Sequence, residues 1–307
     1  MPIDVGQATS FLRDRFDGRA SGVAIAGNGQ WSHAYSFRHD GGDFVIRFGA
    51  HVEDFMKDRA AAGFASRAFP TPAVQEIGEA YGSYYCVSTR AFGTHLDDLD
   101  EAGMRAALPA LFRGLDDARA IEVNDDAGFG LWGDRPALHA SWRAFLLDVA
   151  RDDPLHRTHG WRERLDASPV GDCGFEAGVE RLASLVDACP EERHIVHSDL
   201  LNHNVLVASA ELTAVFDWGC SLYGDFLYDI AWLTFWGPWY PSMRNLDITA
   251  LARDHYRAIG LDVPRFEERL RCNELHIGLN GMSYQAFIGD WDNFQWTGQR
   301  IRAIPRD

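Results

Sequence analysis

The N-terminal third of the chain alternates short apolar runs with glycine-containing turns, which is typical of antiparallel β-strands. The apolar runs that predict strands are 23–26, 33–37, 44–48, 74–77 and 84–89. The Ala-rich segment 53–68 predicts a helix that ends before Pro70-Thr71-Pro72, because two prolines favour extended backbone. Five strands and one helix predict a small sheet lobe of the α+β class.

After Gly93 the apolar residues recur at helical spacing instead. The segments that predict helices are 101–119, 138–150, 176–188, 225–235, 248–260, 264–278 and 283–287. We therefore expect an α+β protein with two lobes. Residues 1–92 form a sheet lobe with its connecting strand, and residues 93–307 form a larger, mainly helical lobe.

One segment of the second lobe combines strand signals with acidic and amide side chains. Residues 197–204 read HSDLLNHN, so that Asn204 follows Asp199 by five positions, and short apolar runs flank them. A turn at 208–211 and a further apolar run lead to Asp217. The hairpin predicted here brings Asn204 and Asp217 near each other, as two ligands of a hard cation must be.

This order of Asp, Asn and Asp indicates phosphoryl transfer from Mg-ATP. In the protein-kinase template the first Asp accepts the proton of the acceptor hydroxyl, while the Asn and the second Asp hold magnesium. Asp199, Asn204 and Asp217 take these three positions. Structural interpretations also exist, since an Asp in a loop often caps a turn or the start of a helix.

The same template needs a cation on the third strand, positioned by a carboxylate on the following helix. Arg47 lies in the apolar run 44–48, and Asp58 lies on the predicted helix. A planar guanidinium differs from the usual lysine, but a longer Arg paired with a shorter Asp keeps the same span. The alternative is a surface ion pair that contributes little to stability.

Charge and composition limit the possible partners and location. The formal net charge is −16, and because nucleic-acid proteins need basic patches, we expect no nucleic-acid partner. The N-terminus has no signal-peptide pattern, and no apolar run reaches the roughly 20 residues that span a bilayer, so we expect no membrane partner. The five cysteines are scattered. We expect a reduced, cytoplasmic monomer.

With these residues identified, the chain resembles the aminoglycoside phosphotransferases, and among them most closely the members that phosphorylate hygromycin B at a 4-hydroxyl. The stretches that carry the resemblance are 58–59, 64–66, 70–74, 77–79, 128–130, 142–143, 189–191, 193–194, 235–239, 277–279 and 284–285, with Gly224-Asp225 and Asp229. The resemblance implies a two-lobed, protein-kinase-like fold. It also implies ATP or GTP as donor, Mg²⁺ as cofactor and an aminoglycoside as acceptor.

The resemblance assigns roles to further residues. Asp199 is implied as catalytic base, Asn204 and Asp217 as magnesium ligands. The residues implied at the nucleotide are Arg47 paired with Asp58, Ser32 after the turn at 27–30, and Thr89 and Ala91 of the connecting strand. Two departures occur in the catalytic loop, where Ser198 replaces a common glycine and His203 stands where small residues are frequent.

Aromatic and acidic side chains beyond the catalytic loop are candidates for the acceptor site. Flat aromatic faces suit sugar rings and hold ammonium groups, and acidic groups attract polyamines. The candidates for the acceptor are Asp199, Asn202, Trp236, Trp239, Asp290 and Asp292. Buried tryptophans and solvated aspartates are the ordinary alternative. For Asp225 we expect a structural role in bracing the catalytic loop.

The function expected from the sequence is Mg-ATP-dependent phosphorylation of an aminoglycoside hydroxyl, with hygromycin B as acceptor and antibiotic resistance as the consequence. The first alternative is a kinase of the same fold for another small alcohol, such as a macrolide, choline or homoserine. The second is a catalytically silent nucleotide-binding regulator, which has no need of all three of Asp199, Asn204 and Asp217. A metal-dependent hydrolase gives no role to Arg47 with Asp58.

Overall fold

The computed structural model describes residues 3–133 and 137–306. The chain forms two compact units, each built from more than one segment. Unit 1 comprises residues 1–99, 106–117 and 201–221, and unit 2 comprises residues 100–105, 118–200 and 222–307. Unit 1 therefore contains the segment of Asn204 and Asp217, which lies beyond the boundary expected at residue 92.

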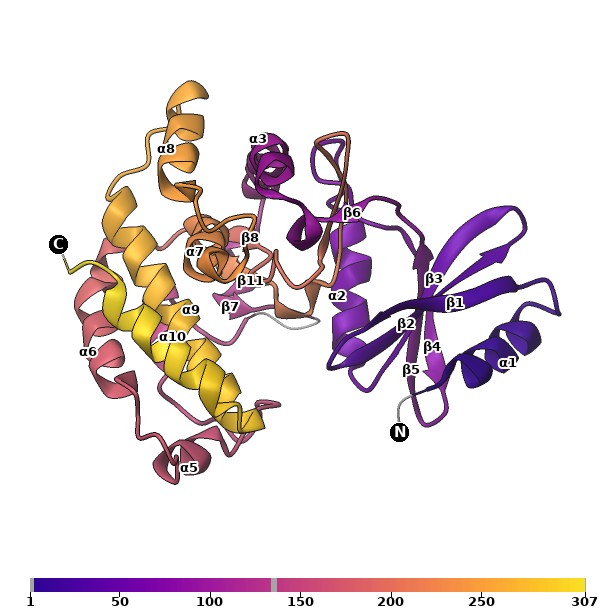
Figure 1. The fold of residues 1–307 in the computed structure, drawn as a ribbon, viewed down its shortest axis with the longest axis horizontal. Coiled ribbons are helices and arrows are strands. Elements are labelled where there is room, and N and C mark those ends of the chain that lie inside the picture. Colours follow the sequence, from indigo (N-terminus) through magenta and orange to yellow (C-terminus); the bar gives the residue numbers. More distant parts are fainter. Residues whose placement is uncertain (1–2, 134–136, 307) are drawn as a thin grey trace. The chain divides into compact units, whose positions relative to one another are not determined.

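Within the described residues, the centre of unit 1 is a five-stranded antiparallel sheet with the strand order β1-β2-β3-β5-β4 (Figure 1). Its strands are β1 (Ser21–Asn28), β2 (Ser32–His39), β3 (Gly42–Gly49), β4 (Val74–Ala80) and β5 (Ser83–Thr89). Asp40 and Gly41 join β2 to β3 with positive φ angles of 46° and 79°, which suits a two-residue hairpin turn. The strands and the α+β class expected from the sequence are confirmed.

Helix α1 (Val5–Arg15) lies beside this sheet and was not expected from the sequence (Figure 1). Its apolar stripe is short, but Asp4 and Gln7 form a capping box at its start. Ala8 and Leu12 are fully buried in a core with Phe37 and Ile46 of the sheet. Tertiary packing thus stabilises a helix whose sequence signal is weak.

Helix α2 (Val52–Ala62) follows β3 and is shorter than the predicted helix, which extended to residue 68. Gly63 caps it, and its N–H donates to the carbonyl groups of Ala60 and Ala61. The helix thus ends at Gly63, a residue of low helix propensity, and the prolines that follow set only its outer limit.

Successive side chains of β3 point to opposite faces of the sheet, so that one face packs in the core and the other carries an ion pair. Ile46 and Phe48 point to the core beside α1, where both are buried. Arg47 therefore points to the opposite face of the sheet, since successive side chains of a strand alternate. This face carries its contacts with Phe55 and Asp58 of α2.

Unit 1 also contains the hairpin predicted after the catalytic loop. Strand β9 (Val205–Ala208) pairs with β10 (Glu211–Val215), and Ser209 and Ala210 turn with φ of 50° and 62°. The Phe216 N–H donates to the Asn204 carbonyl at 3.0 Å, so the hairpin holds the backbones beside Asn204 and Asp217 together. On its other edge β9 pairs with β6 (Thr94–His95), which leads into a 3₁₀ turn at Leu96–Asp98.

Unit 2 is mainly helical, as expected. Its helices are α4 (Trp142–Asp148), α5 (Trp161–Asp166), α6 (Phe175–Leu185), α7 (Leu227–Trp236), α8 (Ile248–Ala258), α9 (Phe266–Ile288) and α10 (Trp291–Ala303). Short 3₁₀ turns occur at 125–127, 186–188 and 237–239. The small sheet of unit 2 has the order β7-β11-β8, with β7 at Gly130–Leu131, β11 at Leu222–Gly224 and β8 at His194–Val196. Helix α3 (Glu101–Arg119) matches its predicted bounds and has residues in both units.

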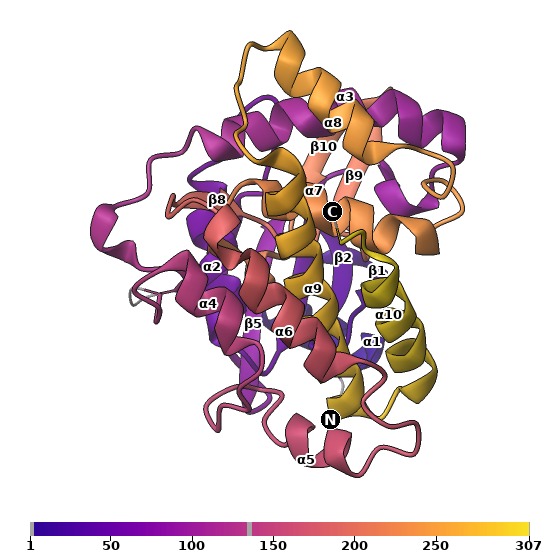
Figure 2. The ribbon, with the colours of Figure 1, turned by 90° about the vertical axis from the view of Figure 1, so that its left-hand side faces the viewer.

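Helix α9 is the central element of unit 2, with α6 and α10 beside it (Figure 2). It contacts α5, α6, α7 and α10, and much of its length is buried. The sequence predicted two separate helices here, 264–278 and 283–287. In the structure Leu279 and Met282, between these two segments, are fully buried, and the helix continues without a break.

None of the helices in the described ranges is both long enough and apolar enough to span a membrane. The five cysteines all fall within these ranges, and each is a free thiol.

A buried ion pair ties α9 to the start of α7. Arg269 donates to Asp225 through Nε at 3.0 Å and through Nη2 at 2.6 Å. The side chains are 5% and 0% exposed, respectively. Asp225 also accepts the Leu227 N–H at 3.0 Å, which orients the first turn of α7. These contacts give Asp225 a structural role between α7 and α9, whereas the N–H groups of the catalytic loop at His197 and Ser198 are accepted by Asp229 instead.

We predict that Arg269→Met lowers the free energy of unfolding by about 3–5 kcal/mol, because it leaves the Asp225 carboxylate buried without its cation. Urea unfolding measures this loss. Arg257→Met is the matched control, since Arg257 pairs with Asp254 on the surface at 2.6 Å and such pairs contribute little. Equal losses in the two variants contradict the prediction.

Candidate active site

Arg47 and Asp58 form a close ion pair between β3 and α2. The side chains are 15% and 8% exposed, so the interpretation as an exposed surface pair does not apply. The Arg47 guanidinium also lies over the Phe55 ring, 5.2 Å from its centroid, which adds a cation–π attraction. Its Nη1 is 3.6 Å from Oδ1 of Asp217. One guanidinium thus contacts carboxylates from α2 and from the end of the β9–β10 hairpin.

Helix α2 also holds the segment that follows Asp217. The Trp218 N–H donates to Oδ1 of Asp58 at 2.9 Å. Lys57, which is 5% exposed, donates through Nζ to the carbonyls of Gly219 at 2.9 Å and Ser221 at 3.1 Å. Asp217 has a left-handed backbone with φ of 63°. Asp58 therefore accepts a backbone N–H of this strained segment, and its neighbour Lys57 donates to two of the segment's backbone carbonyls.

The donor set of Asn204 and Asp217 fits magnesium. An amide oxygen and a carboxylate are hard ligands, and Mg²⁺ is usually bound by one or two such groups together with waters and phosphate oxygens. Asn204 is buried, whereas the Asp217 side chain is 45% exposed and accessible to a ligand. In the described part of the chain, no cluster of three or more His, Cys, Asp or Glu side chains forms an all-protein metal site.

The segment around Asp199 is braced by a buried carboxylate from α7. Asp229 accepts the N–H of His197 at 3.0 Å and the N–H of Ser198 at 2.8 Å. Ser198 has φ of 57°, and the Asp199 N–H donates to His197 Nδ1 at 3.3 Å. Burial raises the pKa of the Asp229 carboxyl to about 7, although the two backbone N–H groups oppose this shift. Asp199 itself is partly exposed.

The remaining candidates for the nucleotide lie along the sheet. Ser32 begins β2, and its carbonyl accepts the Gly29 N–H at 2.9 Å. Thr89 ends β5 and exchanges hydrogen bonds with Ala73, while the Arg90 N–H donates to Asp43 at 3.0 Å. The N–H groups of Thr89 and Arg90 are thus engaged. The next backbone groups along the chain belong to Ala91.

Unit 2 has an open cavity of about 390 Å³ beside the tryptophans considered for the acceptor. Trp239 and Trp296 line it and make an edge-to-face contact with 4.5 Å between ring centroids. Its other lining residues are Pro238, Arg244, Asp292 and Asn293. Trp236 lies behind this lining and stacks on Trp296 at 6.1 Å. The structure therefore brings Trp239 and Asp292 to one cavity, with Trp236 as support.

The two aspartates of this region have different surroundings. Asp290 is the N-cap of α10 and accepts the Asn293 backbone N–H at 3.2 Å and its side-chain amide at 2.6 Å. Asp292 lies in the first turn of α10 and lines the cavity. Asp290 thus has the structural role of a cap, and contact with an acceptor stays a prediction for both residues.

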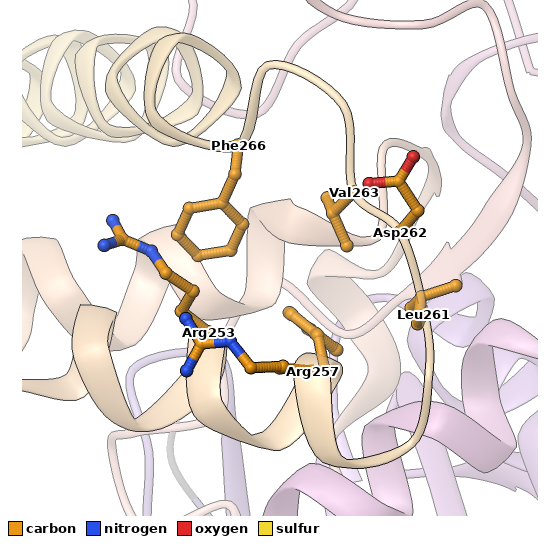
Figure 3. Close-up of a pocket in the computed structure, with 7 residues that line it drawn as sticks. Arg253, Arg257, Leu261, Asp262, Val263 and Phe266 are labelled. Carbon is orange, nitrogen blue, oxygen red and sulfur yellow. The ribbon is translucent and has the colours of Figure 1, made fainter.

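A second cavity of about 290 Å³ lies between α8 and the start of α9 (Figure 3). Arg253 and Arg257 border it, with Phe266 facing Arg253. Arg253 forms an ion pair with Glu267, and Arg257 pairs with Asp254. The residues predicted for catalysis or binding are absent from the lining of this cavity in the described structure.

Several residues at these sites were not found from the sequence. Lys57 acts through contacts with a segment far away in the chain. Asp97 is a further case, because its buried carboxylate accepts the His203 N–H at 2.8 Å. The sequence carries no spacing signal for such pairs. Only an amphipathic helix with a central Lys-Asp pair at 57–58 gave a hint of Lys57.

Comparison with known proteins places these observations in a family. Residues 24–261 match the model of the phosphotransferase enzyme family known as APH. The chain belongs to this family, and the protein-kinase-like fold expected from the sequence is confirmed.

Among the relatives of this chain is the hygromycin-B 4-O-kinase of Escherichia coli. It is 34% identical over 300 residues, which cover 96% of this chain and 84% of that protein. The crystal structure of aminoglycoside phosphotransferase APH(4)-Ia matches with a TM-score of 0.84 and 31% identity over 98% of both chains. A thermostable mutant of it in a ternary complex with AMP-PNP and hygromycin B matches with a TM-score of 0.82 and 30% identity over 96% of both chains.

We predict that Asp229 makes stability fall with rising pH. Its pKa is about 7 in the folded protein and about 3.9 in an unfolded chain. Below about pH 4 both states hold the proton, but between about pH 4 and pH 7 only the unfolded state ionises freely, so the free energy of unfolding decreases. Unfolding in urea across this range measures the slope.

Asp229→Asn removes this contribution, and its curve is flatter than that of the wild type between pH 4 and pH 7. Asp254→Asn is the control, because Asp254 is exposed. Parallel wild-type and Asp229→Asn curves contradict the assigned pKa.

Proposed function

We propose that this protein is an ATP- and Mg-dependent O-phosphotransferase that phosphorylates a hydroxyl of an aminoglycoside, with hygromycin B as the acceptor. The observation that carries the proposal is the Arg47–Asp58 pair, which also contacts Asp217 and its neighbour Trp218. A hydrolase or a passive scaffold has no need for a buried cation beside a metal-binding carboxylate. The substrates in the names of the two relatives support the choice of acceptor.

In this proposal the catalytic residues divide the work as follows. Asp199 accepts the proton of the acceptor hydroxyl, which requires hydrogen-bond reach in the complex. Asn204 and Asp217 hold magnesium through their side-chain oxygens. When bound, magnesium neutralises the charge on the phosphate oxygens. Asp229 accepts the N–H groups of His197 and Ser198 and so fixes the backbone directly before Asp199.

The nucleotide is held by the sheet in this proposal. Arg47 contacts the α- and β-phosphates, and Asp58 keeps the guanidinium oriented. Ser32 contacts phosphate after the turn at its strand start, and the connecting segment from Thr89 to Ala91 receives the base. The relatives' complex with AMP-PNP supports an adenine nucleotide as donor, with GTP as the alternative.

The acceptor site is proposed at the cavity of Trp239, Trp296 and Asp292. An aminoglycoside is a polycation with several sugar rings, so aromatic faces and a carboxylate suit it. Arg244 also lines this cavity. Because its positive charge repels ammonium groups, we expect these groups to lie near Asp292. Asn202 on the catalytic loop is the further candidate contact. The net charge of −16 adds a general attraction for cations.

The consequence of the reaction is a change in the charge of the antibiotic. A phosphate adds roughly two negative charges, which weakens binding to ribosomal RNA and confers resistance. Because ATP and the drug target are both inside the cell, we propose a cytoplasmic location, and we propose that the protein acts as a monomer.

The direct test is ADP release in the presence of a panel of aminoglycosides that includes hygromycin B. We expect turnover with hygromycin B and a turnover at least about a hundredfold lower for Asp199→Asn, the scale of general-base loss. Nucleotide affinity should change little in that variant. Turnover with choline, homoserine or a macrolide alone moves the assignment to another small-alcohol kinase. Near-normal activity of Asp199→Asn removes Asp199 from its role.

We predict that Trp239→Ala raises the KM for the aminoglycoside about tenfold, because stacking and cation–π contacts on this exposed ring are lost. The KM for ATP should stay unchanged. Steady-state kinetics with each substrate varied measures both. Trp291→Ala is the matched control, since Trp291 packs on Phe294 instead of lining the cavity. Equal effects of the two substitutions contradict the proposed acceptor site.

A further inference from the structure

Asp97 lies beside the catalytic loop because of strand pairing. Strand β6 pairs with β9 in the antiparallel register that sets Thr94 opposite Val207 and His95 opposite Leu206. Beyond His95 the chain leaves the strand in the 3₁₀ turn Leu96–Asp98, which places Asp97 within hydrogen-bond distance of the His203 backbone. Leu96, which is fully buried, anchors the 3₁₀ turn that carries Asp97.

The Asp97 carboxylate is directed at the backbone of the loop. Its side chain is 3% exposed, and Oδ2 accepts the His203 N–H at 2.8 Å. Burial raises the pKa of Asp97, while the backbone N–H groups of His203 and Asn202 lower it. Among the described residues, Oδ1 of Asp97 has no hydrogen-bond partner. The Asp97 carboxylate is therefore buried, and the backbone of the loop donates a hydrogen bond to it.

The residues it contacts have a costly conformation. Asn202 and His203 both have left-handed backbones, with φ of 66° and 65°. Two successive non-glycine residues in this region are strained unless neighbours hold them. The next residue is Asn204, so a change at Asn202 or His203 rotates the amide that follows.

We propose that Asp97 is a positioning residue, which holds Asn202 and His203 in their left-handed conformation and so orients Asn204 toward the metal. The inference rests on the proposed function in that Asn204 is taken as a magnesium ligand. Asp97 itself touches neither nucleotide nor acceptor in this scheme. The ring of His203 packs edge-to-face on His95 at 4.9 Å and faces Asp98 at 3.5 Å, which limits the movement of the loop further.

Asp98 provides the matched control. It has the same charge and is adjacent in sequence, but its side chain is 57% exposed and faces the His203 ring instead of the backbone. Asp98→Asn therefore removes one nearby charge without removing the hydrogen bond to the loop. Asp97→Asn keeps an oxygen acceptor but loses the charge, and Asp97→Ala loses both.

The first measurement is amide hydrogen exchange of residues 201–204 in the nucleotide-free protein. We expect exchange to be about tenfold or more faster in Asp97→Ala, the scale for losing a hydrogen bond to a charged group. Asp97→Asn should be intermediate and Asp98→Asn unchanged. Wild-type exchange in a folded Asp97→Ala variant overturns the proposal. If Asp97→Ala does not fold, wild-type exchange in Asp97→Asn does so.

The second measurement is the affinity for AMP-PNP with and without magnesium chloride, by titration calorimetry. We expect the gain in affinity on adding magnesium to shrink about tenfold in Asp97→Ala, with the magnesium-free affinity unchanged. Asp217→Asn is the reference for loss of a ligand. A lower melting temperature with an unchanged magnesium effect means a merely structural role and overturns the proposal.

The two measurements separate this inference from the proposed function. Neither uses an aminoglycoside, so failure of hygromycin B as a substrate leaves the result for Asp97 intact. If the wild type shows no magnesium effect on nucleotide binding, the proposed function fails, and faster exchange in the Asp97 variants still supports the loop contact alone.

Discussion

The organisation of the proposed nucleotide site depends on the two contacts of one buried carboxylate, that of Asp58. It pairs with Arg47 of β3 and accepts the N–H of Trp218, the residue after Asp217. A single side chain of α2 thus fixes both the cation on the sheet and the segment of Asp217, the proposed metal ligand. A buried carboxylate without a cation is strongly destabilised, so the helix, the strand and the hairpin are held to one arrangement.

The same principle recurs in the catalytic loop, where Ser198, Asn202 and His203 have left-handed backbones. Asp229 accepts the N–H groups of His197 and Ser198, and Asp97 accepts that of His203. In each case a buried carboxylate satisfies backbone donors that a regular helix or strand does not pair. The carboxylates come from α7 and from the turn after β6. The strain of the loop is therefore supported by elements far from it in sequence.

Local patterns predicted much of the fold. Hairpins with two-residue turns, such as those at Asp40-Gly41 and Ser209-Ala210, follow from the alternation of apolar residues and turns. The bounds of α3 follow from helical periodicity. Helices α1, α5 and α10 were missed, and α9 was divided, because their stability comes from packing. Gly63 ended α2 earlier than the prolines suggested.

The sequence by itself determined the order of Asp199, Asn204 and Asp217 and the presence of Arg47 and Asp58, since these depend on spacing and residue type. The tertiary structure decided which side chains support them. Lys57 and Asp97 are found only in the fold, because their partners lie on other segments and hydrogen bonds between segments have no fixed spacing in the chain. The tertiary structure also showed that Asp290 caps a helix whereas Asp292 lines a cavity. The sequence does not distinguish these two roles, because the two aspartates lie only two positions apart.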